Sequence, residues 1–150
     1  MINYLLIFII TIMSSFSINA ATISVEKGLF TRHARDKHRF NEDNELIGLE
    51  MTANGMILNA SSFVNSYGAK TKSIGTAFAV AESERVKLDV MVGVLDGYTQ
   101  EQIKTCKGDY CGYIAPRLTI NKEYKGVGVK ASALVLGEAL VLTSGMYINF

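Results

Sequence analysis

The sequence predicts an all-β fold, an eight-stranded antiparallel up-and-down barrel that follows an N-terminal signal peptide. Three observations predict it. The first residues form an uncharged, mainly apolar run; later segments alternate between apolar and other side chains at period two; and most links between them are short and polar or contain glycine. The chain has a single proline, Pro116, so nearly every backbone N–H is free to join a sheet.

The N-terminus has the features of an export signal. Residues 1–13 carry no charge and are followed by small residues up to Ala20 and Ala21. The run has the length of a signal-peptide core and is short for a spanning helix, which needs about 20 apolar residues. We expect a signal peptide over residues 1–20 and a single domain over residues 21–150. An uncleaved N-terminal anchor is the alternative.

Eight segments after the leader are predicted to be strands. In the clearest, Val86, Leu88, Val90, Val92 and Val94 share one face. Turns are expected at residues 53–55, 82–84 and 121–123. A meander of this kind removes its exposed edges by closing on itself. The predicted strands span 23–31, 46–52, 56–65, 73–81, 86–95, 110–120, 127–135 and 139–150.

The position of the apolar face distinguishes two kinds of barrel. A soluble barrel hides this face inside, whereas a membrane barrel turns it to lipid and keeps small and polar residues within. Small residues such as Gly93, Gly128 and Ser132 lie opposite the apolar face and would fit a narrow interior. The sequence therefore favours an outer-membrane barrel over a soluble periplasmic one, although Leu134 and Val141 interrupt the alternation.

Charge and cysteine content limit the partners and the compartment. Lys and Arg number 15 against 14 Asp and Glu, without a basic stripe, so we expect no nucleic-acid partner. Cys106 and Cys111 are close in sequence and suit an oxidising compartment, where a disulfide would stabilise the chain by roughly 2 kcal/mol. Zinc is the competing interpretation, but no histidine lies near them.

The most polar part of the chain, residues 31–45, holds both histidines, His33 and His38. A neutral histidine that meets a serine hydroxyl in space can act as its general base. Serines follow at 61, 62 and 66. The simpler interpretation is a charged turn with solvated histidines, and the acidic residues at 42, 43 and 45 are likewise more typical of a solvated turn than of a calcium site.

The order of these residues resembles a group of small exported proteins of phages and Gram-negative bacteria. The matching residues are His38, the Phe-Asn-Glu of 40–42, Asn44, the Gly-Leu-Glu of 48–50 and the Phe-Val-Asn-Ser-Tyr of 63–67. More distantly the chain is similar to the outer-membrane lipid A palmitoyltransferase family, which moves a palmitate from a phospholipid to lipid A. The resemblance is specific over about thirty residues.

This resemblance implies a catalytic site at His38, Ser66 and Asn65. The family has an aspartate where Asn65 stands, and an amide cannot stabilise an imidazolium by charge as a carboxylate does. The resemblance implies membrane lipids, phospholipid and lipid A, as partners, and neither a metal nor another cofactor. We expect a monomeric acyltransferase; the alternatives are a non-catalytic envelope barrel that binds a lipid or partner through its loops, and a soluble periplasmic carrier.

Overall fold

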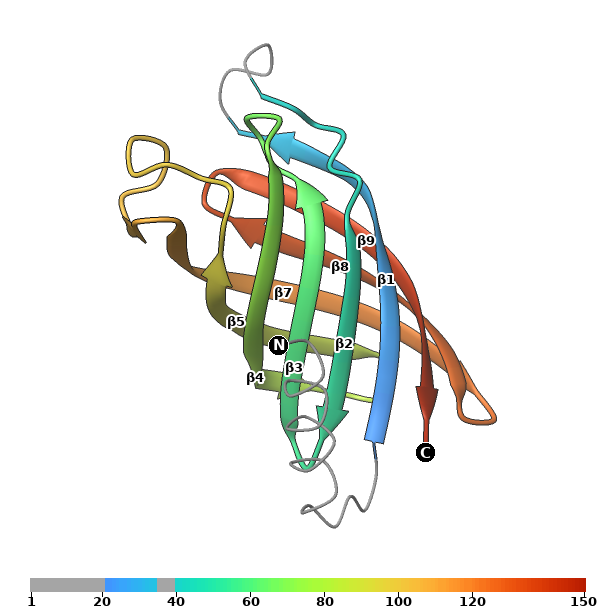
Figure 1. The fold of residues 1–150 in the computed structure, drawn as a ribbon. Coiled ribbons are helices and arrows are strands. Elements are labelled where there is room, and N and C mark those ends of the chain that lie inside the picture. Colours follow the sequence, from blue (N-terminus) through green and yellow to red (C-terminus); the bar gives the residue numbers. More distant parts are fainter. Residues whose placement is uncertain (1–20, 35–39) are drawn as a thin grey trace, which may run out of the picture.

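The computed structural model describes residues 21–34 and 40–150, which form one closed barrel (Figure 1). Neighbouring strands pair antiparallel, β5 pairs with β7, and β1 pairs with β9 to close the ring. The two-residue β6 pairs only with β7, so the wall has eight strands, and the predicted fold class is confirmed. The strands are β1 (Ala21–His33), β2 (Ile47–Ala53), β3 (Met56–Val64), β4 (Lys70–Glu82), β5 (Val86–Leu95), β6 (Cys106–Lys107), β7 (Tyr110–Tyr124), β8 (Val127–Leu136) and β9 (Ala139–Asn149).

The two ends of the barrel differ. One end holds the start of β1, the C-terminus and the short turns at 54–55, 83–85 and 125–126 (Figure 1). The other end, called the loop end below, carries Ala34, the segments 40–46, 65–69 and 96–105, and the β8–β9 turn. The predicted signal peptide lies outside the described residues. Within the part of the chain that the structure describes, no helix has the length and apolar character to cross a bilayer.

The predicted turn at residues 121–123 is wrong. β7 continues to Tyr124, which pairs with Val127, and the turn consists of Lys125 and Gly126. Both have positive φ angles, 52° and 80°, as a tight hairpin between right-twisted strands requires. The polar residues 121–123 resembled a turn because the strand projects beyond the apolar part of the wall there, so both of its faces favour polar side chains.

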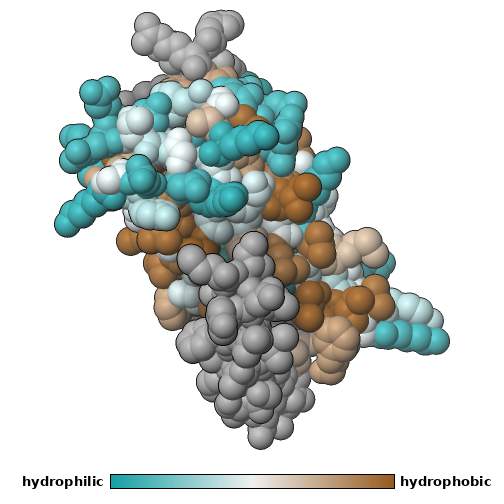
Figure 2. All heavy atoms as spheres, in the orientation of Figure 1, coloured by the Kyte–Doolittle hydropathy of each residue, from teal (hydrophilic) through white to brown (hydrophobic). Residues whose placement is uncertain are grey.

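The outer wall of the barrel is apolar. Figure 2 shows hydrophobic side chains over the visible wall, with hydrophilic ones gathered over the loop end and around the β7–β8 turn. A soluble protein rarely exposes so large an apolar surface, whereas a membrane barrel must. The exposed apolar side chains include Ile23, Val25, Leu49, Leu58, Ile74, Phe78, Val94, Ile114, Leu118, Ile120, Val129, Met146 and Ile148.

The interior holds a cluster of paired charges. Arg117 donates to both carboxylate oxygens of Asp89 at 3.0 and 2.9 Å, and to Glu50 at 2.5 Å. Lys130 contacts Glu50 at 2.9 Å and also pairs with Glu26. Asp89 is fully buried and Arg117 is 5% exposed. Buried charges are tolerated only when each is paired and hydrogen-bonded, so these five side chains fix one another across the barrel.

Nearer the C-terminus, one aromatic ring takes up interior space. Tyr147 on β9 lies directly against Gly128 on β8, where a Cβ atom would fall 2.0 Å from the ring. Only glycine leaves room for this ring. Gly128 was predicted to face a narrow interior, and the structure shows which side chain occupies the space it leaves.

Replacing the central cation of the cluster tests its contribution. We expect Arg117→Ala to lower the free energy of unfolding by about 3–5 kcal/mol, because the fully buried Asp89 loses its partner and Glu50 is left with Lys130. Urea denaturation of the barrel refolded in phospholipid vesicles, followed by the folded band on an unboiled gel, measures this. Lys122→Ala, at an exposed position of the same strand, should change stability by less than about 0.5 kcal/mol. Equal stability of the two variants would contradict the proposed role of the cluster.

Candidate functional site

A histidine and a serine meet at the loop end of the barrel. His33 is the last residue of β1, and Ser66 lies in the turn between β3 and β4. The distance from His33 Nε2 to Ser66 Oγ is 2.7 Å. His33 is only 5% exposed, so solvent competes little for this hydrogen bond. The pair has the geometry in which an imidazole accepts the proton of a serine hydroxyl.

A β-bulge turns His33 inward. The register of β1 on β9 shifts between Gly28 and Phe30, so Leu29 is an extra residue and both Leu29 and Phe30 face outward. Before the bulge the buried side of β1 includes Ser24, whereas after it the buried positions are Thr31 and His33. A bulge of one residue exchanges the faces of everything that follows. Without it, His33 would point away from Ser66.

The segment from Phe40 to Leu46 fills the gap between β1 and β3 above the start of β2. The side chain of the buried Asn44 in this segment donates to Thr31 Oγ1 at 2.7 Å, and the backbone carbonyl of Asn44 accepts from Val64 N at 2.7 Å. Asn41 N donates to the carbonyl of Ser66 at 2.8 Å. The segment is therefore tied to β1, which ends at the histidine, and to β3 and the turn that holds the serine.

Asn65 organises the turn that presents Ser66. Its side-chain nitrogen donates to Thr71 Oγ1 at 3.1 Å and to the carbonyl of Gly97 at 2.7 Å. Its side-chain oxygen accepts from the backbone of Tyr67 at 2.9 Å and of Ala69 at 3.1 Å. With both ends of the amide used in this way, Asn65 holds the β3–β4 turn against the segment that follows β5.

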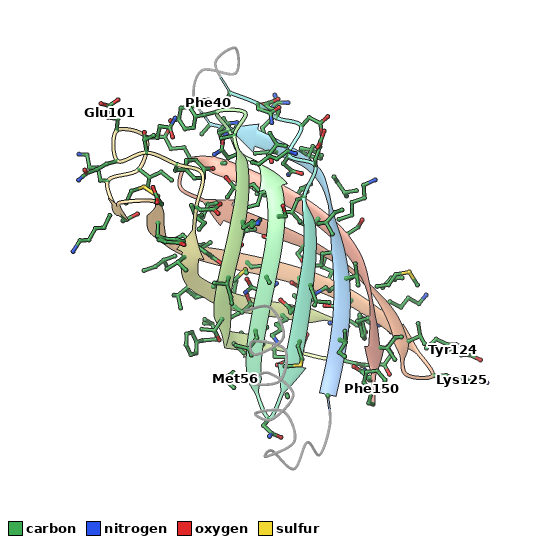
Figure 3. All side chains as sticks on the ribbon, viewed as in Figure 1. Phe40, Met56, Glu101, Tyr124, Lys125 and Phe150 are labelled. Carbon is green, nitrogen blue, oxygen red and sulfur yellow. A yellow bond between two sulfur atoms is a disulfide. The ribbon has the colours of Figure 1, made fainter. Side chains whose placement is uncertain are left out.

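Aromatic rings surround the pair. Phe40 stacks on the His33 ring with centroids 4.5 Å apart, and Tyr67 meets Phe40 edge-on at 5.6 Å and Tyr98 at 6.1 Å. Figure 3 shows Phe40 at the loop end, far from Met56 and Phe150 at the other end. Burial raises the pKa of the Tyr98 phenol, against the opposite effect of a hydrogen bond to Ser66. Tyr98 therefore stays protonated at neutral pH and able to donate a hydrogen bond.

The disulfide supports the segment that carries Tyr98. Cys106 and Cys111 are bonded, which confirms the sequence prediction. The bridge is buried with Leu95, and Tyr98 and Ile103 pack against this group. Covalent closure of the hairpin thus gives the 96–105 segment a fixed base beside Ser66.

Below the pair lies a cavity of about 800 Å³ inside the loop-end half of the barrel. Its apolar lining includes Leu134 and Val141, whose interruption of the alternation is explained by their contact with this space. Much of the polar lining comes from β1 to β4 and the loop after β1, and the deepest part reaches the ion cluster at Glu26, Glu50 and Arg117. The polar residues include Thr31, Asn44, Asn59, Ser61 and Ser73. The cavity lining is therefore mostly apolar, with polar side chains and the ion cluster at its deep end.

The structure places two of the three predicted site residues. Ser66 lies at the cavity mouth and Asn65 beside it, whereas His38 lies outside the described residues. The polar segment offered both histidines as possible bases, and the family resemblance favoured His38. The inward direction of His33 depends on the bulge, which the sequence does not reveal. Among residues 21–34 and 40–150, no group of three His, Cys, Asp or Glu side chains is placed to hold a metal ion.

The closed wall, the apolar exterior and the ion-paired interior define a β-barrel of the outer-membrane type with a histidine–serine pair at its loop end. No protein-family model and no curated protein matches the chain. The chain is similar to a designed transmembrane β-barrel at 8% identity and a TM-score of 0.50, over 90% of this chain and 98% of the designed one. At this identity the likeness concerns the fold alone.

Two structures of the outer membrane protein Ail of Yersinia pestis are also similar. One, in a phospholipid bilayer nanodisc, has 12% identity and a TM-score of 0.46, over 87% of this chain and 99% of Ail. The other, in complex with the heparin analogue sucrose octasulfate, has 14% identity and a TM-score of 0.45, over 87% of this chain and 98% of Ail.

Restoring the aspartate of the resembling family at position 65 tests what that residue does here. We expect Asn65→Asp to lower the free energy of unfolding by about 1–3 kcal/mol, because the carboxylate cannot donate to Gly97 or Thr71. It should not accelerate the reaction of Ser66 with a fluorophosphonate probe. Asn54→Asp in the exposed β2–β3 turn is the matched control and should be neutral. A stable, faster-reacting Asn65→Asp variant would show that residue 65 acts on the histidine.

Proposed function

We propose that this protein is an outer-membrane β-barrel that uses Ser66 and His33 for acyl transfer from a lipid ester. The observation that carries the proposal is the 2.7 Å contact between the buried His33 imidazole and the Ser66 hydroxyl at the mouth of a cavity. The acyltransferase activity implied by the family resemblance, from phospholipid to lipid A, is the specific form we propose. A hydrolase would differ only in using water as acceptor.

The outer-membrane location is supported by the distribution of side chains. Apolar residues cover the outside of the strands, while charges are paired within. Short turns gather at the end that holds the start of β1 and the C-terminus, and longer segments at the other end, as in outer-membrane barrels, whose longer loops face outward. On this arrangement Ser66 lies at the outer surface. The apolar exterior also argues against a soluble periplasmic carrier.

The chemistry follows from the positions of three side chains. His33 Nε2 takes the proton of Ser66 as Oγ bonds to the ester carbonyl carbon, and the carbonyl oxygen becomes an oxyanion to which the Tyr98 hydroxyl donates. When the intermediate collapses, the bond to the leaving alcohol breaks and His33 returns the proton to that alcohol. A lipid A hydroxyl then gives its proton to His33 as its oxygen bonds to the acyl carbon, the bond from that carbon to Ser66 Oγ breaks, and His33 returns the proton to Ser66.

The cavity would receive part of the acyl chain. Met91, Leu95, Leu134 and Leu136 offer an apolar wall below Ser66. The ionised residues at the deep end limit how far the acyl chain can extend, because a hydrocarbon next to Glu50 and Arg117 would displace their polar surroundings.

A second function is favoured by Asn65 at the family's aspartate position and by the polar side chains that interrupt the mostly apolar cavity lining. In this alternative the barrel is not catalytic and binds a lipid or another envelope component through the cavity mouth. The two functions differ in whether Ser66 reacts covalently.

Covalent labelling of Ser66 separates them. We expect a fluorophosphonate to label Ser66 in the detergent-solubilised protein, and Ser66→Ala to abolish labelling. His33→Ala should slow it by roughly a hundredfold or more, as for loss of a general base. His38→Ala tests the histidine that the family resemblance implies: a larger loss there than at His33 would reassign the base. Labelling at the rate of an exposed serine would favour the non-catalytic alternative.

The transfer reaction and the location are tested in cells. Mass spectrometry of lipid A from Gram-negative cells that express the protein should show an added acyl chain, absent with Ser66→Ala. The protein should fractionate with the outer membrane and migrate faster on an unboiled gel. An unchanged acyl pattern despite labelled Ser66 would point to hydrolysis, and recovery in the soluble periplasmic fraction would contradict the membrane location.

A further inference from the structure

We infer that Glu42 is the positioning residue of His33, so that Ser66, His33 and Glu42 act as a serine–histidine–glutamate triad; this rests on the proposed function. Glu42 Oε1 lies 4.0 Å from His33 Nδ1, the ring nitrogen that faces away from Ser66. The same oxygen lies 3.4 Å from the backbone nitrogen of His33. The carboxylate is thus on the far side of the imidazole from the nucleophile, as in known triads.

The protonation of the imidazole requires such a partner. A neutral imidazole carries one N–H, and it can take the serine proton through Nε2 only if that proton sits on Nδ1. His33 Nδ1 is buried and makes no hydrogen bond within the described residues. A buried N–H without an acceptor is costly, and a small rotation of the Glu42 side chain would place its carboxylate within hydrogen-bond distance.

The backbone holds the three residues in one frame. Glu42 O accepts from Thr31 N at 3.0 Å, two residues before His33, and the preceding Asn41 binds the carbonyl of Ser66 at 2.8 Å. Phe40 stacks on the His33 ring and restricts its rotation. The fold of this segment therefore brings a carboxylate close to Nδ1, because the segment is hydrogen-bonded both next to the base and to the nucleophile's residue.

Among the described residues, other charged groups near the pair are less suited. Arg32 precedes His33 on the outward face of β1, and Asp43 is exposed. Glu138 lies in the β8–β9 turn, lines the cavity and has interactions of its own. Asn65 uses its amide on the β3–β4 turn and the segment after β5. Glu42 is 36% exposed, so solvent weakens its attraction for an imidazolium but leaves the hydrogen bond available.

The first test is spectroscopic and independent of activity. In ¹⁵N-histidine-labelled protein in detergent micelles, the ring nitrogen shifts report which nitrogen carries the proton, and His38→Gln assigns the signals. We expect His33 to be protonated on Nδ1 in the wild type. Glu42→Ala should shift the proton to Nε2, whereas Glu42→Gln, whose amide oxygen still accepts, should keep it on Nδ1. Asp43→Asn removes the adjacent exposed charge and should change nothing.

The second test is the labelling rate of Ser66 with the fluorophosphonate. Glu42→Ala should slow labelling by roughly a hundredfold, since the base is lost with its tautomer. Glu42→Gln should also slow it, because no charge offsets the imidazolium, and Glu42→Asp should recover part of the rate. The gel shift of each variant confirms that the barrel is folded.

The outcomes distinguish the two proposals. In one outcome, Ser66 of the wild type is unreactive, but His33 is protonated on Nδ1 only when Glu42 is present. This would overturn the proposed function and keep the positioning role. In the other outcome, Ser66 is reactive, and Glu42→Ala changes neither its labelling rate nor the tautomer of His33. This would overturn the positioning role and leave the proposed function in place.

Discussion

The structure depends on keeping paired charged side chains inside the barrel and away from its apolar outer surface. A closed ring of eight strands leaves a narrow interior, and here that interior contains three carboxylates, a guanidinium and an ammonium that could not face an apolar exterior without a large desolvation cost. Arg117 joins β7 to β5 and β2, and Lys130 joins β8 to β2. These contacts hold opposite walls at a fixed distance, and the cavity on the loop side ends at them.

At the loop end, backbone and side-chain hydrogen bonds hold β1 and β3 in position. Between β1 and β3 the sheet is continued by an irregular segment whose Asn44 replaces missing strand contacts with side-chain hydrogen bonds. Loops built on a rigid barrel can hold reactive groups in place while their sequence stays free to vary. The pair His33 and Ser66 is therefore tied to the wall by the hydrogen bonds of the segment 40–46.

Much of the wall could be predicted from sequence, because a side chain in a strand alternates with a period that the apolar residues report directly. The strand from Val86 to Leu95 was found with its observed limits. The ion pairs could not be predicted, since Arg117 and Glu50 are 67 residues apart and Lys130 and Glu50 are 80 apart. These residues meet only because the ring closes. The alternation of side chains along the chain does not reveal which inward charges will face each other.

The bulge at Leu29 has a consequence for how such a protein can change over evolution. One extra residue decides which face of β1 points inward after the bulge. Loss of that residue would keep the strand pairing and the apolar outer surface before the bulge and yet remove the imidazole from the rim. Related barrels can thus gain or lose rim chemistry through a single insertion or deletion, with the rest of the scaffold unaltered.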